Sequence, residues 1–359
     1  MSRQLKPIHS AKILRALLAI TLLGFAVSAF SQSLPNPYRA VDGWAQLPHG
    51  RQMGAVGGVT MDPDGKHVWA VVRCDAIDPA RFGNECLDSD LDPILKFDLD
   101  GNVVQSFGSG LFIWPHGIDV DPDGNVWVTD AVAAARTPKG SRGHQVIKFS
   151  PDGKVLMTLG TPGVPGSGRN SFNAPSDVVV ADNGDIFVAD GHADDTNNRI
   201  VKFSSDGSFI KAWGKTGYGP GEFRTLHALA IDARGRLFVA DRSNNRIQIF
   251  QQDGTFLATW TQFGRPSGIF FDEREQIYVA DSESDNVQNP GWEMGIRIGD
   301  AETGWVNAFV LYQWGDPRNA AGNGAEFVAV DRAGNLYAGN LYAGEPRPRK
   351  LQKYVRVRP

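Results

Sequence analysis

The sequence has few cysteines, little net charge and, after its first 30 residues, no apolar run long enough to span a membrane. Its only cysteines, Cys74 and Cys86, are too few to hold a metal ion by themselves. In an exported chain, two cysteines this close predict a disulfide bond. The net charge of −4 is spread along the chain, so we expect no nucleic-acid partner.

The N-terminal segment predicts export. Four basic residues precede an apolar run, residues 16–30, and the small residues Ala29 and Ser31 suit cleavage near Gln32. We therefore expect a signal peptide over residues 1–31, a β-propeller domain over 32–359 and a periplasmic or secreted location. A retained membrane anchor is the alternative, although the run is shorter than the about 20 residues needed to span a bilayer.

Glycine is abundant, at 41 of 359 residues, and it recurs in the turns of five of six similar units. Each unit reads as an apolar run, a turn that in most units ends in glycine, and a second apolar run, which is the pattern of a β-hairpin. The six hairpins are predicted at residues 59–71, 118–130, 178–190, 229–241, 269–281 and 328–340. A repeat of this length is typical of closed or stacked repeat architectures.

Two further strands are expected for each hairpin. Third strands are predicted at 94–101, 146–153, 200–207, 247–254, 296–304 and 351–357, and five of them are followed by a fourth. The segment 38–47, whose Trp44 matches the tryptophans that end other fourth strands, supplies the sixth. The prediction is an all-β, six-bladed β-propeller whose ring is closed by an N-terminal strand in the last blade.

The motifs NNRIVKF and NNRIQIF resemble those of NHL-repeat propellers, and this resemblance covers nearly all of the chain after residue 31. An aspartate ends the second strand of several units, and an arginine begins the third strand of two. We interpret them as structural pairs that hold a loop, rather than as catalytic groups. The residues are Asp130, Asp190, Asp241, Asp281, Arg199 and Arg246.

One position, eight residues before the turn glycine or its equivalent, differs between alternate units. In chain order it holds Gly57, His116, Ser176, His227, Ser267 and Glu326. Alternate blades of a six-membered ring are about 120° apart, so the two histidines and the glutamate converge on the axis with coordination positions left open. We expect a divalent metal ion there. Ligand type favours zinc, although two histidines and a carboxylate also suit Fe(II). The alternative is a polar, water-filled channel.

Arg73 and His192 are the remaining candidate site residues. Counted eight residues after their turn glycines, they share one position above the second strand, on the rim of the predicted metal site. A surface salt bridge for Arg73 and an exposed loop position for His192 are the alternative interpretations.

From about Val71 to Tyr337 the sequence resembles the peptidyl-α-hydroxyglycine α-amidating lyases, six-bladed propellers with a catalytic zinc ion held by three histidines. The resemblance is carried by WPHGIDVDPDGNVWVTDA (114–131), FNAPSDVVVADNGDIFVADG (172–191), NNRIVKFSSDGSFIKAWG (197–214), LHALAID (226–232) and VADRSNNRIQIF (239–250).

The resemblance implies roles for five residues. His116 and His227 match two zinc ligands, and Arg73 matches an active-site arginine. The third histidine is replaced by Glu326, and its acidic neighbour by Phe327. His192 aligns with the family's active-site tyrosine, the proposed base, and would act as a general base here.

The expected reaction is C–N cleavage of a small or peptide-derived N-acyl α-hydroxyglycine to an amide and glyoxylate. Two alternatives stay open: a binding or scaffold propeller with a structural metal, and a metal-dependent lactonase or ester hydrolase. Lactonases of this fold use calcium at sites rich in carboxylates and asparagine, and the two axial histidines argue against such a site. A structural calcium ion stays open as a further cofactor. The sequence does not predict the oligomeric state.

Overall fold

The computed structural model describes residues 34–74, 85–134, 142–312, 324–340 and 351–357, so the predicted signal peptide lies outside the described residues. From Pro35 onward the chain forms one unit. Its 24 strands make six four-stranded antiparallel sheets. Within the described ranges, no helix is both long and apolar enough to cross a membrane.

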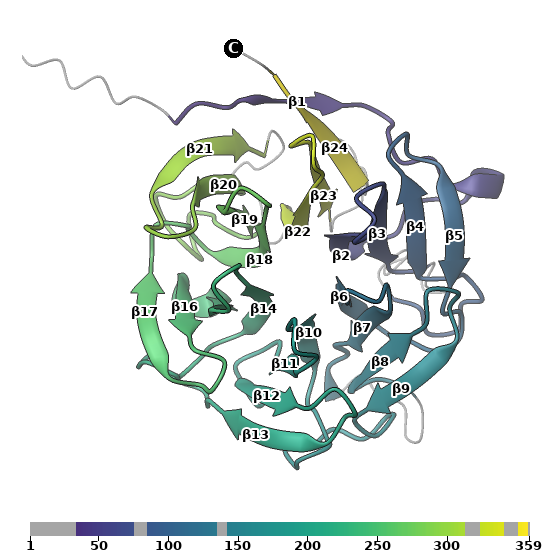
Figure 1. Ribbon diagram of the computed structural model, residues 1–359, viewed down its shortest axis with the longest axis vertical. Coiled ribbons are helices and arrows are strands. Elements are labelled where there is room, and N and C mark those ends of the chain that lie inside the picture. The colour runs from purple at the N-terminus through teal and green to yellow at the C-terminus, as the bar shows by residue number, and fades with distance from the viewer. Residues whose placement is uncertain (1–33, 75–84, 135–141, 313–323, 341–350, 358–359) are drawn as a thin grey trace, which may run out of the picture. The chain divides into compact units, whose positions relative to one another are not determined.

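The sheets are six blades that follow each other along the chain (Figure 1). The first three blades are β2 (Val56–Met61), β3 (His67–Val72), β4 (Ile94–Asp98) and β5 (Val103–Phe107); β6 (Pro115–Val120), β7 (Val126–Asp130), β8 (Gln145–Phe149) and β9 (Val155–Leu159); and β10 (Pro175–Val180), β11 (Ile186–Asp190), β12 (Arg199–Phe203) and β13 (Phe209–Trp213).

The last three blades are β14 (Leu226–Ile231), β15 (Leu237–Asp241), β16 (Arg246–Phe250) and β17 (Phe256–Trp260); β18 (Pro266–Phe271), β19 (Gln276–Asp281), β20 (Gly295–Asp300) and β21 (Val306–Leu311); and β22 (Ala325–Val330), β23 (Leu336–Asn340), β24 (Leu351–Arg356) and β1 (Tyr38–Val41). Two short 3-10 helices, η1 (Pro48–Gly50) and η4 (Arg242–Asn244), lie between strands. All six predicted hairpins are confirmed.

The innermost strand of each blade contacts those of the two neighbouring blades, so that β2, β6, β10, β14, β18 and β22 surround the centre in Figure 1. Large apolar side chains fill the space between adjacent sheets; for example, Phe187 of β11 and Phe238 of β15 are fully buried. This packing explains the apolar runs in the sequence, because both faces of each blade are covered by its neighbours.

The N-terminal strand completes the last blade. β1 pairs antiparallel with β24, from Tyr38 opposite Arg356 to Val41 opposite Lys353. It is shorter than the predicted strand 38–47, and Trp44 lies beyond its end. Chain termini from opposite ends of the sequence therefore meet in one sheet and close the ring without a covalent bond.

The predicted equivalence of Trp44 to other tryptophans holds in the packing. Trp44 lies against the turn glycine Gly101 of blade one, as Trp213 lies against Gly254 and Trp260 against Gly304 of the following blades. Trp314, which was expected to match them, lies outside the described residues. Each tryptophan thus covers the outer turn of the next blade.

The predicted structural pairs are formed in two blades. Asp190 contacts Arg199 at 2.8 Å and Asp241 contacts Arg246 at 2.6 Å, each between a carboxylate Oδ2 and a guanidinium Nε. In blade two, the buried Asp130 has Gln145 opposite it. Cys74 and Cys86 form the predicted disulfide bond.

A buried histidine outside these pairs predicts a pH-dependent stability. His144, just before β8, is fully buried, and its Nδ1 accepts a hydrogen bond from the backbone N–H of Ala174 at 3.1 Å. Burial lowers its pKa to about 4. Below pH 6.5 the unfolded chain binds a proton that the folded chain does not, so the free energy of unfolding falls between pH 6.5 and about 4, by up to about 3 kcal/mol.

The variant His144→Asn should remove this dependence. Its side chain keeps an acceptor, and asparagine tolerates the left-handed φ of 57° that His144 adopts. Relative to the unmodified protein, the unfolding free energy of the variant should rise as the pH falls from 6.5 to 4, as measured by urea denaturation. Parallel pH profiles for the two proteins would contradict the assignment.

Candidate functional site

The six axial residues identified from the sequence occupy the second position of the innermost strands. They therefore lie inside these strands, whereas each predicted hairpin began two residues after them. In every blade the pairing with the second strand shifts by one residue at this point, as in blade two, where Pro115 opposes Asp130 but Ile118 opposes Val128. A β-bulge of this kind redirects a side chain out of the regular alternation.

Hydrogen bonds to the second strand fix the segment that leads into each bulge. In blade two, the carboxylate of Asp130 accepts hydrogen bonds from the backbone N–H groups of Ile113 and Trp114, at 2.8 Å each. In blade four, Asp241 accepts one from Arg224 at 2.7 Å. The aspartates at these positions thus set the backbone two or three residues before the axial histidines.

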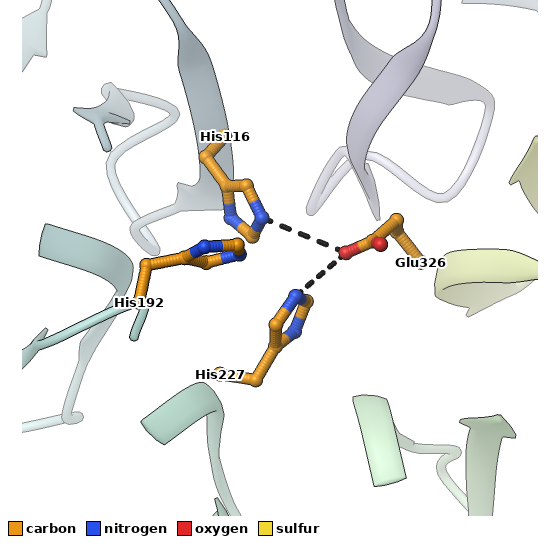
Figure 2. A group of neighbouring side chains, drawn as sticks. All are labelled: His116, His192, His227 and Glu326. Atoms are coloured by element: carbon orange, nitrogen blue, oxygen red, sulfur yellow. Dashed lines mark ion pairs between the residues drawn. The ribbon is translucent and has the colours of Figure 1, made fainter. Parts of the chain in front are cut away.

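His116, His227 and Glu326 meet on the axis as predicted, and all three are buried (Figure 2). Glu326 Oε2 lies 2.6 Å from His227 Nε2 and 3.5 Å from His116 Nε2. The other ring nitrogen of each histidine is held by the backbone carbonyl of the axial residue in the following blade. His116 Nδ1 donates to Ser176 O at 2.7 Å, and His227 Nδ1 donates to Ser267 O at 2.8 Å. Such bonds orient metal-binding imidazoles.

The protonation states of these groups favour a cation between them. Burial lowers the pKa of His116 to about 3 and also lowers the pKa of His227, so both rings are neutral at pH 7. Burial would raise the pKa of Glu326, but the adjoining imidazoles and the charge of Arg242 hold it well below its usual value. With Nδ1 as the donor, each neutral ring directs the Nε2 lone pair toward a carboxylate. A metal ion would satisfy all three groups.

The structure adds His192 to this group. Figure 2 shows its ring beside those of His116 and His227, and one ligand atom from each of the four side chains lies within 4.8 Å of the others. In a tetrahedral zinc site with bonds of about 2.1 Å, two ligand atoms are about 3.4 Å apart. The distances between the ligand atoms here lie on both sides of that value, from 2.6 Å to at most 4.8 Å. Among the described residues, this is the one group of three or more His, Cys, Asp or Glu side chains with converging ligand atoms.

The buried polar atoms of the site support the fit to a metal. His116 Nε2, His192 Nε2, His227 Nε2 and Glu326 Oε2 are all buried, and within the described part of the chain none of them has a hydrogen-bond partner outside this cluster, in which Glu326 Oε2 approaches the Nε2 atoms of His116 and His227. Buried polar atoms without partners are rare and costly in proteins. That all four belong to one cluster indicates a shared ligand for them.

The strand register corrects the prediction that Arg73 and His192 share one position. Arg73 directly follows Val72, the last paired residue of β3, whereas His192 is the second residue after Asp190, the last paired residue of β11. The first hairpin turn spans residues 62–67 and the third spans only 181–185, so a count from the turn glycine is off by one. The equivalent of Arg73 is Arg242, which follows the last paired residue of β15.

Sequence reasoning did not identify Arg242 as a site residue. It is buried, and its Nη1 lies 3.6 Å from Glu326 Oε1 and 3.3 Å from Glu283 Oε1. Glu283 also pairs with Arg265, at 2.9 Å. The signal that could have revealed Arg242 was the arginine in VADR at a place where the similar VADG segment has glycine.

Arg73 is also buried, which rules out the surface interpretation. Its guanidinium lies 3.6 Å from the centre of the Trp114 ring, a cation–π contact. Trp114 in turn stacks on His116, with ring centroids 5.2 Å apart, and presents its ring to His192 at 5.1 Å. Trp114 thus connects an arginine to the histidine cluster.

A cavity of about 310 Å³ opens beside His192. Its wall is formed by His192, Trp114, Asn173, five alanines, Asp195 and Thr196. Small apolar side chains leave this volume free and make it suited to an apolar group next to the histidine cluster.

Comparisons with known proteins agree with the fold. A protein-family model described as a 6-bladed beta-propeller matches residues 167–259, and the family model of the NHL repeat matches residues 112–134. A solved structure titled "Streptogramin B lyase structure" aligns over 88% of this chain and 96% of its own, with a TM-score of 0.52 at 15% identity, which shows a similar fold.

Two curated relatives are more similar in sequence. The mouse peptidyl-glycine alpha-amidating monooxygenase is 42% identical over 42% of this chain, and the Drosophila melanogaster peptidyl-alpha-hydroxyglycine alpha-amidating lyase 1 is 46% identical over 32% of it. The matched regions span only 15% and 19% of the lengths of these relatives. The chain is therefore a six-bladed β-propeller in which one segment matches the NHL repeat, and over part of its length it resembles the peptidyl-α-hydroxyglycine α-amidating lyases.

Proposed function

We propose that this protein is a metal-dependent lyase that cleaves the C–N bond of N-acyl α-hydroxyglycines and releases an amide and glyoxylate. The observation that carries the proposal is the convergence of four buried ligand atoms, three from innermost strands of alternate blades and one from the loop after β11, which in the described residues have no hydrogen-bond partner outside their own cluster. The similarity to proteins named amidating lyases supports the choice of reaction.

His116, His227 and Glu326 would hold the ion, because all three are fixed on innermost strands. A divalent metal bound there would supply a Lewis acid that polarises oxygen atoms of the substrate. The residues suit zinc, which the sequence also favours, and equally a His₂-carboxylate Fe(II) site.

Two arginines would bind the carboxylate of the substrate. Arg73 and Arg242 are both buried and occupy equivalent positions after the second strands of blades one and four. A guanidinium forms bidentate hydrogen bonds to a carboxylate, which would orient the hydroxyl-bearing carbon toward the histidine cluster. The cavity next to His192 would then receive the acyl group, and its alanines favour an apolar one.

The reaction needs one proton transfer and no other reactant. The substrate hydroxyl loses its proton, its oxygen forms the carbonyl of glyoxylate, and the C–N electron pair leaves with the amide nitrogen, which takes up the proton. His192 would accept the hydroxyl proton, since burial and the nearby His116 and Arg242 keep its pKa well below the usual value and its ring neutral.

One feature favours a second function, a binding or scaffold propeller with a structural metal. The cluster consists of four side chains, and structural zinc sites have four protein ligands and no open position. In that case the ion would stabilise the ring of blades and the cavity would bind a ligand without converting it. Activity with and without metal separates the two functions.

The test is release of benzamide and glyoxylate from α-hydroxyhippurate by the purified protein. Chelator treatment should abolish release, and added zinc or Fe(II) should restore it. If the protein binds metal with a whole-number stoichiometry but releases no glyoxylate at any loading, the structural-metal function is the better account. Hydrolysis of esters or lactones by the same preparation would instead indicate the hydrolase alternative.

The disulfide is compatible with the expected export to an oxidising compartment. The signal peptide and the structural calcium ion stay predictions.

A further inference from the structure

We infer that His192 is a fourth protein ligand of the metal in the substrate-free protein, in addition to His116, His227 and Glu326. The inference rests on the metal centre of the proposed function and changes its coordination from three protein ligands to four. It also changes the role of His192, which was expected from the sequence to be a general base on the rim.

The placement of the imidazole carries the inference. The ring of His192 contacts those of His116 and His227, with centroids 4.6 and 5.0 Å apart. The residue is half-buried, yet its Nε2 is buried and has no hydrogen-bond partner in the described ranges. A histidine that only lined the rim would direct its polar atoms to water, where hydrogen bonds are available. Here the unpartnered atom is directed inward, to the ligand atoms.

The loop that carries His192 is fixed in this position. Gly191 has a φ of 152°, and a Cβ there would lie 2.5 Å from the backbone nitrogen of Asn198. The fully buried Asn198 donates from its side chain to Ala193 O at 2.8 Å and to Thr216 Oγ1 at 3.1 Å. Supporting hydrogen bonds of this kind preorganise a metal ligand.

The four ligands differ in what supports them. His116, His227 and Glu326 are in β6, β14 and β22, whereas His192 follows β11 on a loop. Four protein ligands fill the coordination sphere of a tetrahedral ion. A substrate would therefore have to displace one of them, and the loop-borne His192 is the one whose departure leaves the strands unchanged. Its freed Nε2 would then be next to the substrate hydroxyl.

The test is titration of the chelator-treated protein with Co(II), followed by calorimetry and by the visible d–d absorption. His192→Ala should weaken Co(II) binding by at least about tenfold, and should change the absorption spectrum because one nitrogen ligand is lost. His67→Ala is the matched control: this histidine pairs with Asp64 in the turn between β2 and β3, and its loss should change neither readout.

A second variant makes the result independent of any effect on folding. His192→Cys replaces the imidazole with a thiolate, which is also a ligand for these ions. It should restore tight binding and add a thiolate-to-cobalt charge-transfer band. The two native cysteines are joined in the disulfide and cannot produce this band.

The outcomes separate the inference from the proposed function. If His192→Ala binds Co(II) with unchanged affinity and spectrum, and His192→Cys shows no charge-transfer band, the inference is wrong while the three-ligand metal centre stands. If the unmodified protein itself binds no Co(II) or Zn(II), the metal centre fails and both proposals fall together.

Discussion

Replacing Glu326 with alanine should abolish metal retention and reduce any glyoxylate release by about 10³-fold or more. Glu326 is the one anionic ligand, and its Oε2 approaches both His116 and His227. A bound metal contributes several kcal/mol to transition-state stabilisation, and each 1.4 kcal/mol corresponds to a factor of ten in rate. Loss of the ligand that joins the two imidazoles should therefore remove most of the catalysis.

The variant Glu326→His would refine this result, because it replaces one ligand with another. It should retain metal, since imidazole is a ligand for zinc and for Fe(II). Glu273→Ala is the control: Glu273 is exposed and pairs with Arg332 at 3.0 Å, so metal content should not change. Metal content is measured on the purified proteins by atomic emission. Equal metal content in Glu326→Ala, His116→Ala and the unmodified protein would contradict the axial site.

The fold could be predicted because the same physical solution recurs six times. A turn such as PDG, with the glycine at positive φ, joins two apolar runs in most blades. In one blade Glu275 takes the place of the glycine, with a φ of 58°. Each single hairpin is a weak signal, but six at a similar spacing leave few architectures. Closure by the N-terminal segment followed from counting, since one outer strand was missing at one end and present at the other.

The axial cluster of candidate metal ligands could be predicted for the opposite reason, because its residues break the repeat. His116, His227 and Glu326 replace small residues at one position in alternate blades, and the symmetry of the ring brings them together. The sequence did not reveal the bulge that places them inside the strands. Bulges depend on the hydrogen bonding of two strands, and one strand alone carries no clear signal for them.

The relative positions of Arg73 and His192, and the place of Arg242 in the site, escaped prediction because turn and loop lengths vary. One extra residue in the first hairpin turn shifted the position of Arg73 relative to His192 and hid its equivalence to Arg242. The loop that carries His192 is held by hydrogen bonds from Asn198, six residues away along the chain, to Ala193 and Thr216. Such contacts form only in the folded loop, and no periodic pattern in the sequence predicts them.

Replacing Trp44 with alanine should destabilise the protein by about 3–5 kcal/mol, the usual cost of removing a large buried aromatic side chain. Trp44 is 6% exposed and fills the space between the first and last blades, with ring centroids 5.7 Å from Phe97 and 4.9 Å from Tyr337. Its indole N–H also donates to Leu99 O at 2.9 Å. These contacts hold the non-covalent junction of the ring, so their loss should open the ring where the two ends of the chain meet.

Urea denaturation measures this effect, with Trp305→Ala as the matched control. Trp305 is 74% exposed, so its removal should change the free energy of unfolding by no more than about 0.5 kcal/mol. Because the first and last blades carry Arg73 and Glu326, opening the junction should also weaken Co(II) binding in Trp44→Ala before the chain unfolds globally. A Trp44→Ala protein as stable as Trp305→Ala would show that the strand pairing of β1 with β24 is sufficient to close the ring.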